Sequence, residues 1–279
     1  MDPKQLIGDK PGVLIRGMSF LDYEKLPAIN WSRLKPYLKS AAHGKAAERE
    51  SDDADFLDYG QALHRAVLEP GLFDQEFGTI PEDAPTKRSN EGKAWWQAFE
   101  AANVGRTMLK PETLVAVRRG AEAVYAHPRM AAMLNATGSQ REVVALAMDP
   151  EFGIYRKARL DLLSSWQGES FIVDLKSAFD ASNYGMSRAM NTNAYHAQLS
   201  FYRQTLNYVA PYDRRAALFA VEKDPTIAVA YDVDEATLEV GEQDVVKAMR
   251  TFIESDAAQR WPGYPDGMLS LPAWRLKER

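Results

Sequence analysis

The chain has 279 residues, of which 46% are hydrophobic and 26% are charged, and this balance is ordinary for a soluble globular protein with a real core. Its 34 basic and 39 acidic side chains give a formal net charge of −5, which argues against coating of nucleic acid by bulk electrostatics but leaves room for a narrow, locally positive cleft. The absence of cysteine excludes disulfides, thiol catalysis, cysteine zinc sites and iron–sulfur clusters, so any metal must bind to oxygen or imidazole.

The first half of the chain has a mostly helical pattern, based on apolar spacing and helix-end residues. Helices are expected over 30–38, 56–68, 91–102, 111–126 and 128–135. The first opens at Asn30 or Ser32 and contains Pro36, which can break or kink it, and Pro70-Gly71 ends the second. The acidic stretch Glu48 to Asp55 and the polar segment between Ile80 and Asn90 are typical of loops.

After Gly138 the pattern changes to short, alternating or β-branched segments, which predict an antiparallel meander. Its strands are expected at 142–148, 154–163 and 170–176, divided by Asp149-Pro150 and by 164–168. Helices at 181–190 and 193–207, strands at 214–222 and 226–232, and an amphipathic helix at 235–256 follow. From Trp261 we expect an irregular tail packed by its aromatic rings.

These elements predict one domain over 1–279, of the α+β (α/β) class. A mostly helical portion at 1–138 precedes a central mixed sheet with its helices at 139–232, and a helix and tail complete the chain at 233–279. The sequence has no internal repeat, no apolar run of membrane-spanning length and no signal-peptide pattern at its first residues, so a cytoplasmic protein is expected.

The hairpin predicted between the last two strands of the meander brings two carboxylates together. The midpoint between Asp161 and Asp174 falls between Gln167 and Gly168, inside the predicted turn, so the two aspartates should lie opposite each other. Because side chains alternate along a strand, Lys176 should share the face of Asp174.

Alternation also sorts the other residues of the hairpin. On the second strand, Val173 and Leu175 should point away from Asp174. On the first strand, Lys157 and Arg159 should share the face of Asp161, with Leu160 and Leu162 opposite.

Two close carboxylates repel each other and normally share a proton or bind a cation, and oxygen ligands favour Mg²⁺ or Mn²⁺. Such an ion can activate a water and stabilise the leaving oxygen of a phosphodiester, while Lys176 orients the water and stabilises negative charge. A bare Asp-x-Lys pattern also fits an exposed hairpin with a cross-strand ion pair, so it does not establish this chemistry alone.

His64 is a candidate third ligand. Gly60, four residues earlier on the same predicted helix, leaves open space beside the imidazole. Taken alone, the pair also fits a surface histidine next to a packing glycine. Gln198 and Tyr202 share one helix face with Tyr195 and can hold a phosphate or a water, although a core stripe is an equal alternative. Glu142 is a further candidate carboxylate, for which an exposed strand edge is the competing interpretation.

Taken together, these segments resemble the exonuclease domain of the RecE (exodeoxyribonuclease VIII)-like phage family, in the RecB-like branch of the PD-(D/E)xK nucleases. The resemblance covers most of the chain and follows the family's motif order. It is carried by Leu26-Pro27-Ala28-Ile29-Asn30-Trp31-Ser32-Arg33-Leu34, Tyr59-Gly60-Gln61-Ala62-Leu63-His64-Arg65-Ala66-Val67-Leu68-Glu69-Pro70, Lys157-Ala158-Arg159-Leu160-Asp161, Ile172-Val173-Asp174-Leu175-Lys176-Ser177 and Tyr195-His196-Ala197-Gln198-Leu199-Ser200-Phe201-Tyr202.

The resemblance implies a restriction-endonuclease-like core in which His64, Asp161, Asp174 and the Leu175 carbonyl bind the divalent ion and Lys176 is the catalytic lysine. Gln198 and Tyr202 match the family's Gln-x-x-x-Tyr motif beside the active site. Such enzymes look like toroidal homo-oligomers, trimers or tetramers, that take double-stranded DNA ends. They digest one strand from its 5′ end and leave a 3′ single strand for an annealing protein of the RecT type.

The chain departs from the family at Asn30, where relatives usually have serine, and at Leu160, where they often have proline before the aspartate. The absence of cysteine excludes the relatives that carry an iron–sulfur cluster. Two alternatives stay open: an endonuclease or flap nuclease with the same fold and metal, and a non-catalytic DNA-binding recombination protein. No Gly-x-Ser-x-Gly, Walker, Gly-x-Gly-x-x-Gly or His-Glu-x-x-His motif occurs, so those enzyme classes are set aside.

Overall fold

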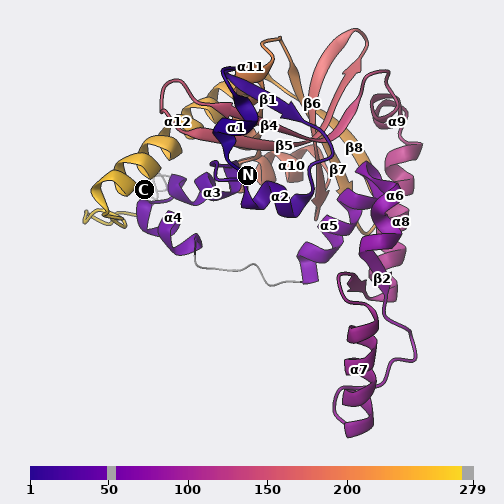
Figure 1. The fold of residues 1–279 in the computed structure, drawn as a ribbon. Coiled ribbons are helices and arrows are strands. Elements are labelled where there is room, and N and C mark those ends of the chain that lie inside the picture. Colours follow the sequence, from indigo (N-terminus) through magenta and orange to yellow (C-terminus); the bar gives the residue numbers. More distant parts are fainter. Residues whose placement is uncertain (49–54, 272–279) are drawn as a thin grey trace.

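The computed structural model describes residues 1–48 and 55–271. Within these residues, the strands of the central sheet pair in the order β1-β4-β5-β6-β7-β8 (Figure 1). These strands are β1 (Gly12–Ile15), β4 (Gln140–Met148), β5 (Tyr155–Trp166), β6 (Glu169–Ala178), β7 (Arg215–Glu222) and β8 (Ile227–Val233). β6 and β7 are parallel and the other neighbours are antiparallel, which makes the sheet mixed, as predicted.

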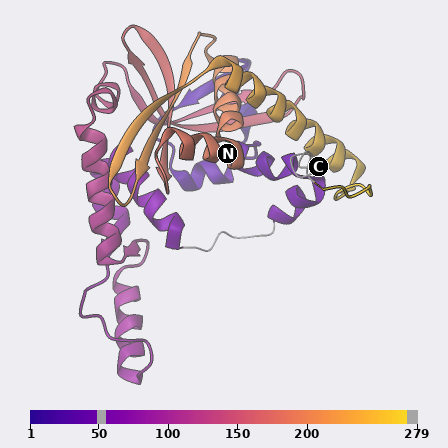
Figure 2. The ribbon, with the colours of Figure 1, turned by 180° about the vertical axis from the view of Figure 1, so that it is seen from behind.

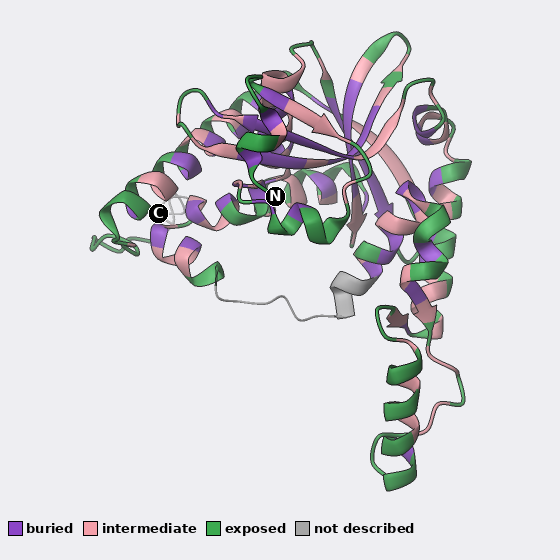
Figure 3. Ribbon diagram, in the orientation of Figure 1, coloured by how far each residue is buried: buried purple, intermediate pink, exposed green. Residues whose placement is uncertain are grey.

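Helices cover both faces of this sheet, and the core lies between them and the strands (Figures 1 and 2). On one face α5 (Asp55–Leu68), α8 (Pro111–Ala126) and α9 (Pro128–Leu134) pack on apolar residues of β6 and β7 such as Val173 and Phe219. On the other face α3 (Trp31–Leu34), α11 (Tyr195–Val209) and α12 (Glu235–Ala258) enclose Ala158 and Leu160 of β5. The strands are therefore largely buried (Figure 3).

Shorter elements complete the fold. They are α1 (Pro3–Ile7), α2 (Phe20–Lys25), the 3₁₀ helix η1 (Lys35–Leu38), α4 (Ala41–Ala47), α6 (Pro70–Glu76), α7 (Asn90–Ala102), α10 (Asn183–Thr192) and the parallel pair β2 (Phe77–Thr79) and β3 (Thr107–Leu109). α7 projects away from the sheet, and much of its surface is exposed (Figure 3). In the part of the chain that the structure describes, no helix combines the length and hydrophobicity that a bilayer span needs.

The predicted helices and strands are present, with one correction at the hairpin turn. β5 extends through Ser164 to Trp166, and β6 begins at Glu169. The turn between them is Gln167-Gly168, and both residues have positive φ angles, as a tight two-residue hairpin turn requires. The stretch 164–168 is thus mostly strand and not a loop. α5 ends at Leu68, just before Pro70-Gly71, as predicted, and a separate helix, α6, begins with Pro70 in its first turn, where the missing N–H costs nothing.

Several elements were not anticipated, namely β1, α1, α2, α4, α6, β2 and β3. The predicted helix at 30–38 is α3, capped by the Asn30 side chain, followed by η1 at the Pro36 position. The predicted acidic loop lies outside the described residues except at its ends: Glu48 follows α4, and Asp55 begins α5. The tail after Trp261 is irregular, and Trp261 itself packs on the core, as expected.

Lys157 of β5 links the N-terminal segment to the sheet through hydrogen bonds. Its buried ammonium donates to the carbonyl oxygens of Tyr23 at 2.6 Å, Leu26 at 2.9 Å and Glu24 at 3.1 Å, at the end of α2. A buried ammonium needs such acceptors, because an unpaired one would be strongly destabilising. Lys157 is therefore committed to holding α2, and it does not reach the aspartates of the hairpin.

Candidate active site

Asp161 and Asp174 lie where the hairpin register places them. The pairs Leu162–Val173 and Leu163–Ile172 put Asp161 opposite Asp174 at the next position, as predicted. Regular pairing of β5 with β6 ends at Leu162, and the Asp161 carboxylate accepts a 2.7 Å hydrogen bond from the Leu175 N–H. The Asp161 side chain thus accepts from a backbone N–H of β6 at the point where the β5–β6 backbone pairing stops, and this bond fixes the carboxylate beside β6.

Glu142 lies on β4 opposite Asp161, between the pairs Arg141–Leu162 and Val143–Leu160. Its φ angle is +52°, a left-handed conformation that is rare for a residue with a side chain. Alternation along β5 breaks at the same level, because Leu160 packs in the core with α11 whereas Leu162 packs in the core with α5. The prediction that these leucines share a face is therefore wrong, since both strands are irregular at Glu142 and Asp161.

Lys176 and the Gln-x-x-x-Tyr motif surround Asp174 on the face covered by α11. The Lys176 ammonium lies 2.7 Å from Asp174 Oδ2 and 4.9 Å from the centre of the Tyr195 ring. Gln198 donates from its amide nitrogen to Asp174 Oδ1 at 3.3 Å and to the Tyr202 hydroxyl at 2.8 Å. Gln198 and Tyr202 therefore orient the Asp174 carboxylate, and the alternative that they are only a core stripe is not supported.

His64 reaches the aspartates from α5, on the other face of the sheet. Its Nδ1 lies 3.6 Å from Asp161 Oδ2. Gly60 has a different role from the predicted one: a side chain there would come within 3.3 Å of Ser177 Oγ on β6. Gly60 lets α5 approach β6 directly after Lys176, and this close approach brings the imidazole to the site.

A divalent cation fits the donors gathered here. Single ligand atoms of His64, Glu142 and Asp161 all lie within 4.8 Å of one another. Asp174 is near enough for its carboxylate to raise the pKa of Asp161, and its buried Oδ2 lies 2.7 Å from the Lys176 ammonium. Carboxylates with one imidazole suit a hard or borderline cation. The predicted ligands are thus close together, and Glu142, predicted only as a further candidate, joins them.

The charges of the site hold its groups in defined protonation states. Burial, together with the Asp174 and Glu142 carboxylates, raises the pKa of Asp161 well above its ordinary value. Burial disfavours the charged form of Lys176, but Asp174 and Asp161 outweigh it and hold the pKa of the ammonium above its usual value. Burial and the Lys176 ammonium lower the pKa of His64. The imidazole is therefore neutral at neutral pH, which is the form that binds metal.

Two further cationic groups lie near the site: Arg159, which was expected on the strand of Asp161 without a role, and Lys35, which was not predicted. Arg159 forms an ion pair with Glu142, lies 3.6 Å from Glu69 and donates to the Met18 carbonyl at 3.2 Å, so it links β4, α5 and the N-terminal segment around the ligands. Lys35 of η1 is the second group: burial and the nearby Lys176 ammonium lower its pKa. A second cationic side chain thus lies on the Lys176 side of the site. The ion contacts of Arg159 and the position of Lys35 depend on tertiary packing, and the sequence around Lys35 gives no signal for it.

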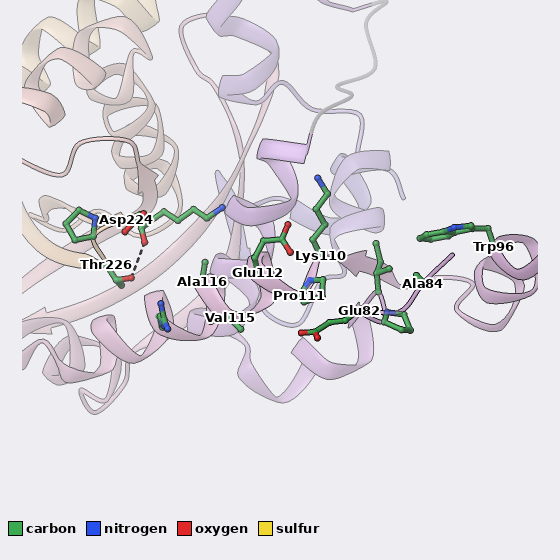
Figure 4. Close-up of a pocket in the computed structure, with 15 residues that line it drawn as sticks. Glu82, Ala84, Trp96, Lys110, Pro111, Glu112, Val115, Ala116, Asp224 and Thr226 are labelled. Atoms are coloured by element: carbon green, nitrogen blue, oxygen red, sulfur yellow. Dashed lines mark hydrogen bonds between the residues drawn. The ribbon is translucent and has the colours of Figure 1, made fainter. Parts of the chain in front are cut away.

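A separate pocket of about 1140 Å³ lies between α8, the segment before α7 and the β7–β8 turn (Figure 4). Its lining includes Trp96, Pro111 and Thr226, which come from three different parts of the fold. None of the candidate metal ligands at the hairpin lines this pocket. Its mixed lining contains no converging set of carboxylates or nucleophiles. The chemistry of the molecule is therefore concentrated at the hairpin.

Comparison with known proteins gives one family. A family model described as a PDDEXK-like domain of unknown function (DUF3799) matches residues 30–268. No curated protein matches the sequence significantly.

Solved structures show a similar fold. The crystal structure of a protein named “putative exonuclease” from Eubacterium rectale has a TM-score of 0.57 and 13% identity, covering 86% of this chain and 88% of that chain. The crystal structure of SSO0001 also matches, with a TM-score of 0.29 and 13% identity over 70% of this chain and 85% of that chain. Because the sequence identity is only 13%, the similarity to the Eubacterium rectale structure supports the fold alone, namely the arrangement of the sheet and the helices around the hairpin.

Proposed function

The chain belongs to the PDDEXK-like family DUF3799, and on this premise we propose that it is a Mg²⁺-dependent DNA exonuclease that digests linear duplex DNA in the 5′-to-3′ direction. The family and the fold support a nuclease. The observation that carries the proposal is the placement of Asp161 opposite Asp174, with Lys176 at 2.7 Å from Asp174 and His64 at 3.6 Å from Asp161. The end dependence and the direction rest on the resemblance of the sequence motifs to the RecE-like family.

The residues of the site divide into ligands and charge carriers. Asp161, Asp174, Glu142 and His64 would hold the ion, together with the Leu175 carbonyl that the motif resemblance implies. A bound Mg²⁺ supplies Lewis acidity and lowers the pKa of water. Mn²⁺ should substitute, because it accepts the same oxygen and imidazole donors.

Lys176 acts as a cation in this proposal. Because Asp174 and Asp161 raise its pKa, the ammonium stays protonated and cannot act as a base near neutral pH. It would orient the attacking water and stabilise the negative charge that develops on the phosphate. Gln198 keeps the Asp174 carboxylate in place through its 3.3 Å hydrogen bond, and burial raises the pKa of Tyr202 so that its phenol stays neutral.

The partners of this proposed enzyme are double-stranded DNA ends, further copies of the chain in a trimeric or tetrameric ring, and a RecT-type annealing protein that takes the 3′ strand. The ring encloses the duplex in this proposal and keeps the enzyme on its substrate. Light scattering of the purified protein tests the ring, since a monomeric mass would contradict it.

Linear duplex DNA labelled separately at its 5′ and 3′ ends, incubated with Mg²⁺ or with EDTA, tests the function. We expect early release of the 5′ label, no release in EDTA and no cutting of a closed circular duplex. Prompt cutting of the circle would identify an endonuclease instead. Asp174→Ala should lose hydrolysis while it still binds DNA. If the wild type binds DNA as tightly as Asp174→Ala but does not hydrolyse it, a non-catalytic recombination protein is favoured.

A further inference from the structure

Phe179 is the most exposed aromatic side chain among the described residues, with 96% of its surface open to solvent. It follows β6 directly, three positions after Lys176. At about 3.3 Å per extended residue this separation is about 10 Å, which equals about three base steps of a DNA strand. An apolar ring is thus fully exposed within a few nucleotides of the candidate active site.

The backbone next to Phe179 is firmly held. Ala181 is buried, its N–H donates to Glu222 Oε2 at 2.7 Å, and its carbonyl accepts from the Tyr231 hydroxyl at 2.7 Å. Gly185 of α10 adds to this, because a side chain there would come within 2.4 Å of the Asp180 carboxylate. The exposure of Phe179 therefore belongs to an ordered segment, tied to β7, β8 and α10.

The charges around this segment nearly cancel. Lys223 and Asp224 follow the end of β7, where Glu222 pairs with Ala178, and Asp180 follows Phe179. Arg188 adds a positive charge and lies over the exposed ring of Tyr184 at 5.7 Å. A surface of this kind offers aromatic faces without a net positive field. It suits a flat apolar group better than a phosphate backbone.

We propose that Phe179 is a stacking platform for an unpaired nucleobase of the DNA end whose strand is cut at the hairpin site. This inference rests on the proposed nuclease function and specifies how the duplex end binds: its terminal bases are separated near the active site. Aromatic rings stack on any base, so the platform would act without sequence preference. Tyr184 and Arg188 extend the same surface.

Binding in EDTA tests this platform without hydrolysis. The probe is a single-stranded oligonucleotide with 2-aminopurine at its end, and anisotropy and base fluorescence are read together. Phe179→Ala should weaken binding by about tenfold and restore the fluorescence that stacking quenches, whereas Phe179→Trp should keep both. An abasic terminus should show no difference between Phe179→Ala and wild type.

Tyr212 provides a matched control, since it is 60% exposed and precedes β7, at the opposite end of the parallel β6–β7 pair. Tyr212→Ala should bind like the wild type. The salt dependence of binding should be the same for Phe179→Ala and wild type, because stacking releases no counterions.

Three results would overturn the proposal. If Phe179→Ala binds the oligonucleotide as the wild type does while the wild type digests DNA, the platform is wrong and the nuclease function stands. If Phe179→Ala instead lowers the oligomer mass measured by light scattering, the Phe179 side chain packs against another copy of this chain and not against a base. A wild type that neither binds nor digests DNA would remove the function and the platform together.

Discussion

Replacing Glu142 with glutamine should weaken metal binding, an effect that is measured as the difference in stability with and without metal because the ion pair with Arg159 is lost in both states. Glu142 brings one of the carboxylates that lie within 4.8 Å of the other ligand atoms, and the substitution removes its charge but keeps its size. In metal sites, even loss of a group that only supports a ligand lowers affinity by about 10-fold to 100-fold. We therefore expect at least a tenfold weaker Mn²⁺ affinity.

The effect on unfolding follows from this affinity. At an Mn²⁺ concentration of about 100 times the wild-type Kd, the ion stabilises the wild type by about 2.7 kcal/mol, and a tenfold weaker variant gains only about 1.4 kcal/mol. Isothermal calorimetry gives the Kd, and denaturant unfolding with Mn²⁺ and with EDTA gives the two free energies of unfolding. An Mn²⁺-induced stabilisation equal to that of the wild type would refute the assignment of Glu142 as a ligand.

Two variants separate the charge of Glu142 from its backbone conformation. Glu142→Gly also removes the carboxylate, but it relieves a left-handed φ that costs about 1–2 kcal/mol, offset by the greater flexibility of unfolded glycine. In EDTA it should therefore be more stable than Glu142→Gln by up to about 1 kcal/mol. Glu69→Gln is the matched control, since Glu69 lies 3.6 Å from the same Arg159 and outside the ligand group. Its Mn²⁺-induced stabilisation should equal that of the wild type.

Three further predictions concern the rest of the site. Lys176→Ala should lose hydrolysis by about 100-fold or more and still bind metal, and calorimetry that shows no metal binding would contradict this division of roles. Because the folded-state pKa of Asp161 is raised, its proton stabilises the metal-free fold below the ordinary pKa, and this stability is lost as pH rises through the raised pKa. Asp161→Asn should remove this loss of stability. Urea unfolding in EDTA, measured from pH 4 to pH 8 in about one-unit steps, should therefore show a free energy of unfolding that depends less on pH than in the wild type. An identical pH dependence in the two proteins would exclude the effect of Asp161. Gly60→Ala should push α5 away from Ser177 Oγ and weaken metal binding, and Gly60→Ala/Ser177→Ala should recover it, whereas no recovery would place the fault elsewhere.

The hairpin was predictable from the sequence because local rules determine it. Alternation sets which residues of β6 share a face, and a symmetric count around Gln167 and Gly168 sets the register of Asp161 and Asp174. The helices that carry His64 and Gln198 were also predictable, because the spacing of apolar residues within each segment indicates a helix. These features need only residues that are close in sequence.

The rest of the site depends on contacts that no local pattern reports. Glu142 sits in a strand-like sequence, and its left-handed φ arises only where β4 meets β5 at Asp161. Lys35 and Arg159 acquire their places when the N-terminal segment and α5 pack on the sheet. β1 is only four residues long and becomes a strand by pairing with β4. Tertiary packing decides all of these.

The close approach of α5 to β6 at Gly60 has a consequence for biosynthesis. The hairpin ligands are near neighbours in sequence, whereas His64 belongs to a helix far upstream and meets them only through a long-range contact. Contacts of this kind close large loops, and the entropy of closing a loop must be overcome before the contact stabilises the fold. A nascent chain emerging from the ribosome would have released α5 long before β5 and β6 exist. We expect the contact of His64 with Asp161 to complete the candidate ligand set only after α5 packs on β6, so chains that lack this packing should lack the proposed nuclease activity.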